Sequence, residues 1–518
     1  MSDINNSSQE KYGFPFVDLE ETKPDDDAIS LVPREYAIKH QILPLGAKNG
    51  SIKVAIGSPE QLTAADDLGI LINKTVEISI ADPNLIRDRL EARFLQGMMS
   101  DLPTEEDAIP DGDNVDDLAD LTKLAGEAAV VQMVNVMFAQ AVRDGVSDIH
   151  IEPYEKELKV RFRVDGILKD TMSPPRRMHA AFISRLKILA ELNIAERRLP
   201  QDGRIKLTLG SRQIDVRVSI VPTVQGERAV LRILDKGTSI LTLEQLGMRA
   251  DTLEIMRKVI SIPYGMILVT GPTGSGKSTT LYAALQEIYS PERNILTIED
   301  PVEYQVPGIG QIQVRANIGL TFANGLRSIV RQDPDVIMVG EIRDHETAEI
   351  AIHAALTGHL VFSTLHTNDA PSAITRLLDM GVEPFLAASS IVGVLAQRLI
   401  RRNCPDCVEP YMPEPDALIA LGLNESHYDV NNPPFRHGAG CEKCGGSGYR
   451  GRRGVYELMT VDEEVRRMTV EREAASKIKD HALKVQNMRT LLGEGRLAVL
   501  EGISTAEEVL RVCQREDI

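Results

Sequence analysis

An eight-residue stretch from Gly271 to Ser278 combines residue types suited to holding phosphate groups. It fits the pattern G-x-x-x-x-G-K-[S/T], follows the apolar segment 266–270 and precedes a helix that we expect to begin near Thr279. Glycines let successive backbone N–H groups turn inward around a β-phosphate, and the N-terminus of the following helix adds partial positive charge. The alternative is a glycine-rich turn without a ligand, which the strand-loop-helix context disfavours. We therefore predict that ATP binds Gly271, Pro272, Thr273, Gly274, Ser275, Gly276, Lys277, Ser278 and Thr279, with Lys277 at the β- and γ-phosphates and Ser278 holding Mg²⁺.

A second group of chemically active residues lies further along the chain. Four of the five cysteines form two C-x-x-C pairs, Cys404 with Cys407 and Cys441 with Cys444. In a reducing compartment this pattern indicates metal ligands before disulfides, and four thiolates match a tetrahedral structural Zn²⁺ without an open catalytic position. Redox-active dithiols and unliganded thiols are the alternatives. Cys513 stands alone near the C-terminus, where we expect only a small helix residue.

The elements that surround the glycine-rich stretch predict an α/β fold. Apolar strands are expected at 267–270, 295–298, 336–339 and 360–364, with helical segments between them, which is typical of a parallel sheet covered on both faces. A helix is expected at 128–142 and strands at 158–164 and 214–219 in a preceding domain. A smaller α/β domain should occupy the region from about residue 31 onward.

Composition and charge suggest where these domains begin and end. Residues 1–27 hold eight acidic and two basic side chains, and residues 100–120 hold nine acidic and no basic ones, so both segments favour extended chain. The predicted organisation is an acidic arm (1–30), a small N-terminal α/β domain (31–96), an acidic linker (97–122), a second domain (123–236), a nucleotide-binding domain (237–400), a four-cysteine zinc module (401–453) and a C-terminal helical domain (454–518).

The net charge and the apolar runs of the chain argue against two classes of protein, nucleic-acid coating proteins and membrane-spanning proteins. With 58 basic and 76 acidic residues the net charge is −18, which argues against a protein that coats DNA or RNA. The longest apolar run, 384–400, is interrupted by polar residues and is too short for a membrane helix, and residues 1–27 lack the features of a secretory signal. We expect a cytoplasmic protein that reaches a membrane only through a partner.

Several further motifs carry a family resemblance. They are SDIHIEP (147–153), RLPQDGRI (198–205), ILTIEDPVEY (295–304), RQDPDVIMVGEIRD (331–344) and TGHLVFSTLHTND (357–369). Together with the phosphate loop and the cysteine pairs they resemble the ATPases of type II secretion and type IV pilus systems, from about residue 125 onward. The resemblance implies a RecA-like P-loop domain preceded by a PAS-like α/β domain, and six copies in a closed ring.

The same resemblance implies roles for residues around the phosphate loop. Glu341 would be the general base that deprotonates the attacking water. Because Gly340 separates Glu341 from the apolar strand, a Mg²⁺ contact from this strand would run through water. Glu299 and Glu303 are candidates to position that water or the metal, and His366 resembles a γ-phosphate sensor, with His359 one strand-length earlier. The alternatives are solvated loop carboxylates and structural histidines.

Arginines of the second domain are candidates to complete the site. Arg204, Arg217, Arg228 and Arg232 match arginine-bearing strands of the family, and we favour Arg217 and Arg232 as donors of positive charge to the nucleotide. A flexible connection near 235–239 would let hydrolysis change the angle between the two domains. Surface arginines on β-strands are the alternative.

Within this family, the cysteine module followed by segment 448–458 resembles the assembly-type enzymes rather than the retraction-type ones. Segment 504–512 and the short single N-terminal domain resemble the secretion enzymes more than the pilus enzymes. The predicted function is therefore an ATP-hydrolysing hexameric motor for pseudopilus assembly and protein export, with pilus assembly as the alternative. Residues 31–96 would dock on the cytoplasmic part of an inner-membrane platform protein. A nucleic-acid translocase, which needs a basic, aromatic-lined channel, and a non-hydrolysing nucleotide switch are less favoured.

Overall fold

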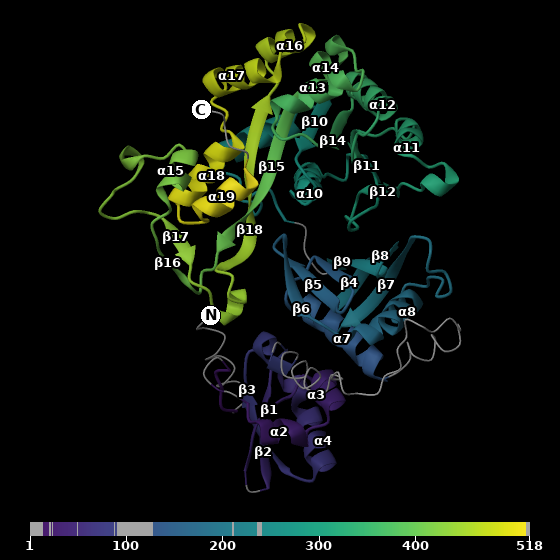
Figure 1. Cartoon of the computed structure of the whole chain (residues 1–518), viewed down its shortest axis with the longest axis vertical. Coiled ribbons are helices and arrows are strands. Elements are labelled where there is room, and N and C mark those ends of the chain that lie inside the picture. The colour runs from purple at the N-terminus through teal and green to yellow at the C-terminus, as the bar shows by residue number, and fades with distance from the viewer. Residues whose placement is uncertain are drawn as a thin grey trace. The chain divides into compact units, whose positions relative to one another are not determined.

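The structure is a computed structural model that describes residues 14–19, 22, 24–48, 50–87, 89–90, 128–209, 212–235 and 241–513 (Figure 1). The acidic linker predicted at 97–122 and most of the connection predicted at 235–239 lie outside these residues. The chain divides after residue 237 into two compact units. Among the described residues, no helix is both long enough and apolar enough to cross a membrane.

A three-stranded sheet organises residues 14–90. β1 (Leu43–Lys48) is antiparallel to β2 (Ser51–Ile56), and β2 is parallel to β3 (Thr75–Ile80). Helix α4 (Leu62–Ile72) makes the crossover that a parallel pair of strands requires. Helices α2 (Asp26–Leu31) and α3 (Arg34–His40) precede the sheet, and residues 83–87 and 89–90 are helical.

The predicted acidic arm over residues 1–30 is wrong for residues 14–19, which contact the folded domain. Leu19 is buried, and the backbone N–H of Val17 donates to the carbonyl oxygen of Ile80 at 2.9 Å. Phe14 and Phe16 also pack against this core. The acidic composition hid these residues, because an average over 27 residues is dominated by charge even when a few well-spaced apolar side chains are enough to anchor the segment.

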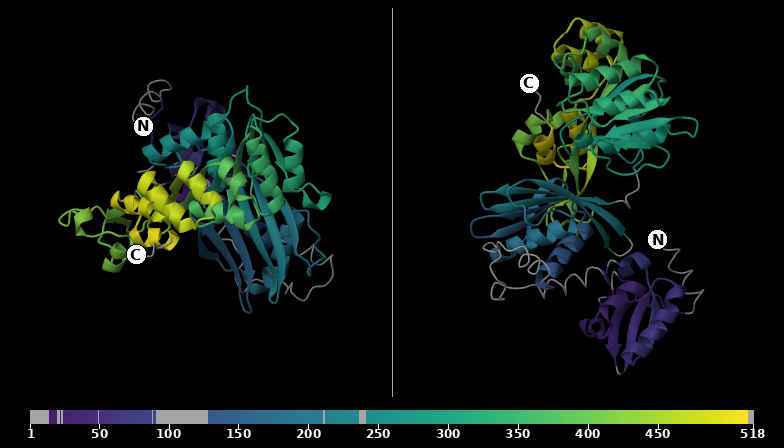
Figure 2. Two further views of the ribbon diagram at one scale, coloured as in Figure 1. Left: turned by 90° about the horizontal axis from the view of Figure 1, so that it is seen from above. Right: turned by 90° about the vertical axis from the view of Figure 1, so that its right-hand side faces the viewer.

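Residues 128–235 form a six-stranded antiparallel sheet in the order β6-β5-β4-β9-β8-β7. Its helices α7 (Ala128–Arg143) and α8 (His179–Leu189) lie against one face (Figures 1 and 2). Side chains alternate along a strand, so apolar residues such as Ile149 and Leu231 face the helices, while Asp148 and Arg232 point to the other face. The strands are β4 (Asp148–Pro153), β5 (Leu158–Val164), β6 (Ile167–Met172), β7 (Gln201–Leu209), β8 (Arg212–Thr223) and β9 (Gly226–Asp235).

The second unit contains a seven-stranded sheet in the order β12-β11-β13-β14-β10-β15-β18, parallel except for β18. The strands are β10 (Gly265–Thr270), β11 (Ile295–Glu299), β12 (Gly310–Gln313), β13 (Val336–Val339), β14 (Leu360–Leu365), β15 (Ile391–Asn403) and β18 (Tyr449–Thr460). The helices along this part are α9 (Ala250–Ile260), α10 (Lys277–Ile288), α11 (Phe322–Ile329), α12 (His345–Leu356), α13 (Pro371–Asp379) and α14 (Pro384–Ser390).

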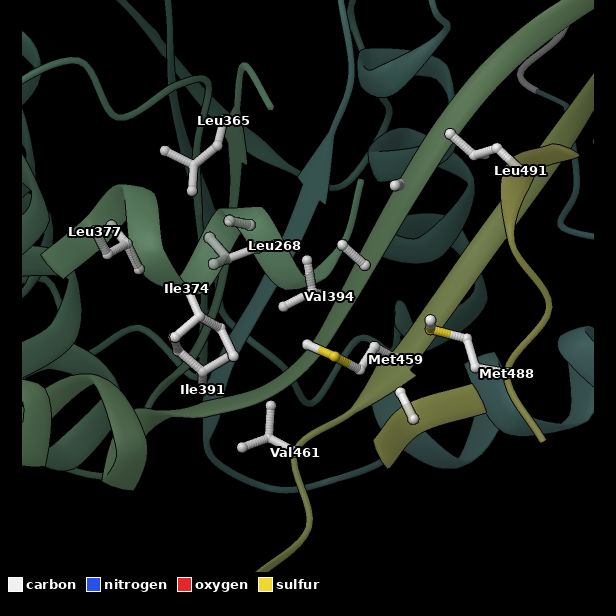
Figure 3. Close-up of a cluster of buried hydrophobic side chains, with 14 of the residues drawn as sticks. Leu268, Leu365, Ile374, Leu377, Ile391, Val394, Met459, Val461, Met488 and Leu491 are labelled. Atoms are coloured by element: carbon white, nitrogen blue, oxygen red, sulfur yellow. The ribbon is translucent and has the colours of Figure 1, made fainter. Parts of the chain in front are cut away.

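Helices cover both faces of this sheet, so its strands are almost continuously apolar. Leu268 and Val361 belong to one buried cluster, whereas their neighbours Ile267 and Phe362 belong to another. Figure 3 shows part of the first cluster, in which Leu268, Val394 and Met459 pack together. The two clusters fix the sheet between its helices and therefore fix the loops at its edge.

β15 and β18 continue beyond the sheet and carry residues 404–448 between them. This lobe contains β16 (Val408–Pro410), β17 (Arg436–Gly438) and α15 (Pro415–Ala420). The boundaries predicted at 400/401 and 453/454 fall inside β15 and β18. The C-terminal helices contribute Val465, Ile478, Val499 and Val509 to the same buried cluster as the sheet. These helices are α16 (Glu463–Val470), α17 (Ala475–Val485), α18 (Leu491–Leu500) and α19 (Ala506–Val512).

Candidate active site and metal centre

The glycine-rich loop connects β10 to α10, as the sequence predicted. Gly271, Gly274 and Gly276 have φ angles of +147°, +79° and +90°, a region that residues with side chains rarely adopt. The Lys277 ammonium group donates to the carbonyl oxygens of Gly271 and Pro272 at 2.8 and 3.1 Å. The nine residues predicted to bind ATP, 271–279, therefore occupy this loop and the first turn of α10, with Ser278 at the helix start.

The parallel strands bring two further predicted residues to the same edge. Thr270 pairs with Leu365, so the loop after β10 lies beside His366 at the end of β14. Glu341 follows β13, and one of its carboxylate oxygens lies 3.7 Å from Nε2 of His366. Its charge also influences Lys277, whose pKa falls to about 8 through burial despite the opposing effect of Glu341. Lys277, Glu341 and His366 thus form one cluster.

Charges in this cluster set the state of His366. Burial and the positive charge of Lys277 lower the pKa of His366 below its usual 6.5. The imidazole is therefore neutral near pH 7 and can both donate and accept one hydrogen bond. By contrast, His359 lies just before β14, at the opposite end of that strand from His366. Its Nδ1 lies 2.8 Å from the carbonyl oxygen of Ala354 in the last turn of α12.

Glu299 is more enclosed than the sequence suggested. Its side chain is buried and accepts hydrogen bonds from Tyr282, from Thr297 at 2.6 Å and from Gln311 at 3.0 Å. The Tyr282 hydroxyl also accepts from the backbone N–H of Glu303 at 3.4 Å. In this arrangement Glu299 links β11 to α10, the helix that carries Lys277, and both of its oxygens already have donors.

Sequence reasoning missed two residues that contact or adjoin this cluster. Arg343 donates to Glu341 at 2.6 Å. It lies two residues after Glu341 within a motif that was recognised, so its position could have indicated a partner for that carboxylate. Tyr282 gave no such signal, because a tyrosine on the buried face of a helix normally predicts packing alone.

The predicted arginines lie in the other compact unit, on the open face of the six-stranded sheet. Arg204, Arg217 and Arg232 are direct cross-strand neighbours on β7, β8 and β9. Arg232 donates to Asp148 at 2.9 Å and is 51% exposed. Arg228 lies 2.6 Å from Glu152, which also pairs with Arg161 at 2.7 Å. Arg228 and Arg232 are therefore held by buried carboxylates of the SDIHIEP motif, while part of their charge stays accessible.

The four predicted cysteines converge at the far end of the β15–β18 hairpin. Cys404 and Cys441 have their sulfur atoms 3.9 Å apart, as do Cys407 and Cys444, and Cys441 lies 3.7 Å from Cys444. Four thiolates around one tetrahedral Zn²⁺, with Zn–S bonds of about 2.3 Å, would lie about 3.8 Å apart. The geometry of the sulfur atoms therefore fits zinc.

The thiols of the cluster differ in their electrostatics, because burial raises the pKa of Cys404 and raises that of Cys407 to about 12. Burial raises the pKa of a thiol, but backbone N–H groups of Cys441 and Gly448 point at Cys444 and lower its pKa to about 6. A thiolate is the form that binds a metal. Cys513 does not belong to this cluster. Its thiol is buried elsewhere, 3.6 Å from the carbonyl oxygen of Leu491.

Comparison with known proteins agrees with this arrangement. A family model described as "Type II/IV secretion system protein" matches residues 123–511, and one described as "MshEN domain" matches residues 12–99. The Type IV pilus assembly ATPase PilB of Myxococcus xanthus is 43% identical over 526 residues, which cover 98% of this chain and 90% of that protein. Type II secretion system protein E of Pseudomonas aeruginosa is 51% identical over 405 residues, covering 78% of this chain and 79% of that protein.

A solved structure gives the same result for the fold. The crystal structure of the pilus retraction motor PilT with bound ADP aligns with a TM-score of 0.51 and 26% identity, covering 72% of this chain and 95% of that chain. The sequence match extends over most of the chain, and the α/β unit carries the phosphate loop at the expected sheet edge. The chain therefore belongs to the type II/IV secretion system protein family of P-loop ATPases.

Proposed function

We propose that this protein is a homohexameric ATPase that drives pseudopilus assembly and, through it, protein export by a type II secretion system. The observation that carries the proposal is the cluster of Lys277, Glu341 and His366 at one edge of a parallel sheet. Relatives that share about half of their residues with this chain are named type II secretion system proteins.

The residues of the cluster divide the chemistry between them. Backbone N–H groups of loop 271–276 and the Lys277 ammonium group hold the phosphates. Glu341, oriented by Arg343, accepts a proton from the attacking water. Neutral His366 donates a hydrogen bond to the γ-phosphate and so reports its presence. Mg²⁺, held by Ser278, would neutralise charge that develops on the phosphate oxygens.

The site is completed by a neighbouring copy of the chain. Arg217 and Arg232 supply positive charge to the nucleotide of the adjoining subunit in a ring of six. The carboxylate of Asp148 holds the guanidinium of Arg232 by an ion pair. Because ATP and ADP differ in the charge that these arginines meet, hydrolysis changes the preferred angle between the two units of each subunit.

Two other parts of the chain have supporting roles. Cys404, Cys407, Cys441 and Cys444 hold a structural Zn²⁺, whose fit rests on the spacing of their sulfur atoms. Residues 31–96 dock on the cytoplasmic part of an inner-membrane platform protein. The protein thus acts in the cytoplasm and associates with the inner membrane through this partner.

One observation favours pilus assembly as a second candidate. The pilus assembly relative aligns with 98% of this chain, whereas the secretion relative aligns with 78% at higher identity. Deleting the gene and measuring both exported proteins and surface pili separates the two functions. Loss of export with normal pili is expected. Loss of pili with normal export would assign the protein to pilus assembly.

The ATPase reaction is tested by phosphate release from the purified full-length hexamer with Mg²⁺. We expect Lys277→Ala to abolish nucleotide binding, because the ammonium group that meets the phosphates is gone. Glu341→Gln should bind ATP normally but release phosphate at least about 10²-fold more slowly, since the base is lost.

Glu349→Gln is the matched control, because Glu349 is an exposed carboxylate on α12 near Glu341 in sequence. It should hydrolyse ATP like the parent protein. Parental turnover by Glu341→Gln would refute the assignment of the base. Absence of phosphate release from the parent hexamer, even with its membrane partner, would refute the motor itself.

A further inference from the structure

The middle of β15 places two polar side chains beneath the phosphate loop. Gln397 is 1% exposed and Arg398 is 7% exposed, although β15 is otherwise largely apolar. Neither residue belongs to a motif that the sequence analysis used. A buried amide and a buried guanidinium are costly unless their polar atoms have partners, so the contacts they make are informative.

Gln397 contacts the loop at both of its ends. Its side-chain oxygen accepts a hydrogen bond from the Thr280 hydroxyl, in the first turn of α10, at 2.7 Å. A Cβ atom at Gly276 would come within 2.7 Å of the side-chain nitrogen of Gln397. A Cβ atom at Gly271 would come within 2.5 Å of the backbone carbonyl oxygen of Gln397. Only glycine at these two positions allows the loop to lie this close to β15.

Arg398 contacts the loop that follows His366. Its guanidinium donates to the carbonyl oxygen of Asn368 at 3.0 Å and to the side-chain oxygen of Asn368 at 3.3 Å. It also donates to the carbonyl oxygen of Gln397 at 3.1 Å. The Thr270 hydroxyl makes a parallel link, because it accepts from the backbone N–H of Thr367 at 2.8 Å. The segment after His366 is therefore attached to the base of the phosphate loop.

Among the described residues Arg398 forms no ion pair, and the carboxylates of Glu457 and Asp369 act on its charge only from a greater distance. Among the residues that the structure describes, no carboxylate lies within 4.0 Å of its guanidinium, and its donors meet only carbonyl and amide oxygens. The guanidinium instead lies against Gly271, where an added Cβ atom would be 3.2 Å from one of its nitrogens. A buried cation of this kind favours an anion nearby, and the phosphates of a nucleotide in loop 271–276 would provide one.

We propose that Gln397 and Arg398 are positioning residues that hold the phosphate loop and the segment after His366 as one unit, with Arg398 adding positive charge behind the bound phosphates. This inference rests on the proposed binding of ATP at residues 271–279. It explains how the segment after His366 keeps its place relative to the bound phosphates. It also assigns Asn368 as the link between Arg398 and that histidine.

The test compares affinity with turnover in the full-length protein. Affinities for MgADP and for a non-hydrolysable MgATP analogue are measured by calorimetry, and kcat by phosphate release. Arg398→Gln should weaken the binding of both nucleotides about tenfold or more, because a charged partner is lost. Asn368→Ala should keep affinity within about twofold and lower kcat about tenfold, since it releases only the segment after His366.

Arg398→Lys and Arg402→Gln complete the comparison. Arg398→Lys keeps the charge but not the forked donors, so it should restore most of the affinity and little of the kcat. Arg402 is exposed on the same strand, and Arg402→Gln should behave like the parent. A purely structural role would instead lower the melting temperature of nucleotide-free Arg398→Gln while leaving affinity unchanged.

The outcomes separate this inference from the proposed function. If Lys277→Ala loses nucleotide binding but Arg398→Gln binds both nucleotides like the parent, the positioning role is refuted and the nucleotide site stands. Parental kcat in Asn368→Ala refutes the link to His366. If Lys277→Ala itself binds nucleotide normally, the proposed site is wrong. Should Arg398→Gln fail to fold, the Arg398→Lys separation of affinity from kcat still decides the question.

Discussion

At the scale of single residues, Glu457 on β18 is an unusual buried carboxyl group. It is 1% exposed and accepts hydrogen bonds from the backbone N–H groups of Ala370 at 2.8 Å and Leu491 at 3.3 Å. It therefore links the segment after His366 to the start of α18. Burial raises its pKa to about 7, because the low-dielectric interior disfavours its charged form.

This raised pKa predicts a pH dependence of stability. The folded protein binds the proton more tightly than the unfolded chain, so the stabilisation is complete below the unfolded pKa of 4.5 and is lost as the pH rises through about 7. Glu457→Gln removes the titration and keeps an acceptor. Between pH 6 and pH 8 the free energy of unfolding should fall by roughly 1 to 2 kcal/mol more in the parent than in Glu457→Gln. Unfolding curves at the two pH values measure this difference, and equal losses would contradict it.

The residues of the site differ in how far the sequence could predict them. The phosphate loop, Glu341 and His366 could be predicted from the sequence because each follows an apolar strand. Parallel strands bring their carboxyl ends to one edge of the sheet. Arg398 and Asn368 lie 30 residues apart, and their contact depends on the pairing of β15 with β10, which no local pattern specifies. Glu299 was predicted at the site, but its bond to Tyr282 could not be predicted.

At the scale of elements, the long hairpin of β15 and β18 is the part that the sequence described least well. Its first strand begins in the interrupted apolar run 384–400, which the structure divides into α14 and most of β15. Pairing continues from Gly393 with Thr460 to Asn403 with Tyr449. The lobe of residues 404–448 is therefore held in place by the pairing of β15 with β18 and by the cluster of four cysteines.

Removing the metal from this lobe should loosen it selectively. We expect about one zinc per chain by elemental analysis, because four thiolates complete one tetrahedral site. Cys441→Ser should lose the metal and lower the melting temperature, and chelation of the parent should do the same. Cys513→Ser is the control and should keep its zinc, since Cys513 lies outside the cluster. Full zinc content in Cys441→Ser would exclude the four-cysteine site.

At the scale of the whole molecule, the residues proposed for catalysis are divided between two compact units. Lys277 and Glu341 belong to the unit after residue 237, and Arg217 and Arg232 to the unit before it. Composition singled out the acidic segments within residues 1–30 and 97–122, whereas the division into two units falls after residue 237, near the point where the sequence begins to alternate apolar strands with helices. The path of residues 14–19 along β3 could not be predicted from the same averages.

A division of the site between copies predicts complementation in mixed rings. Each variant should be inactive alone. Lys277→Ala lacks the ammonium group that binds the phosphates, and Arg232→Ala lacks the positive charge donated to the neighbouring copy. Mixing equal amounts should restore activity, because about a quarter of the subunit contacts then join an intact phosphate loop to an intact arginine. Phosphate release across a series of mixing ratios measures the effect. No recovery at any ratio would place both residues in the same copy's site.

One strand joins the two chemically active regions of the second unit. β15 passes under the phosphate loop at Gln397 and ends at Asn403, next to Cys404. The seven residue steps from Gln397 to Cys404 span roughly 23 Å, so a tilt of about 5° at the nucleotide would shift the cysteines by roughly 2 Å. The hairpin of β15 and β18 can thus serve as a lever arm. A metal at its tip would stiffen it, so that a small rotation at the nucleotide moves the tip instead of bending the hairpin.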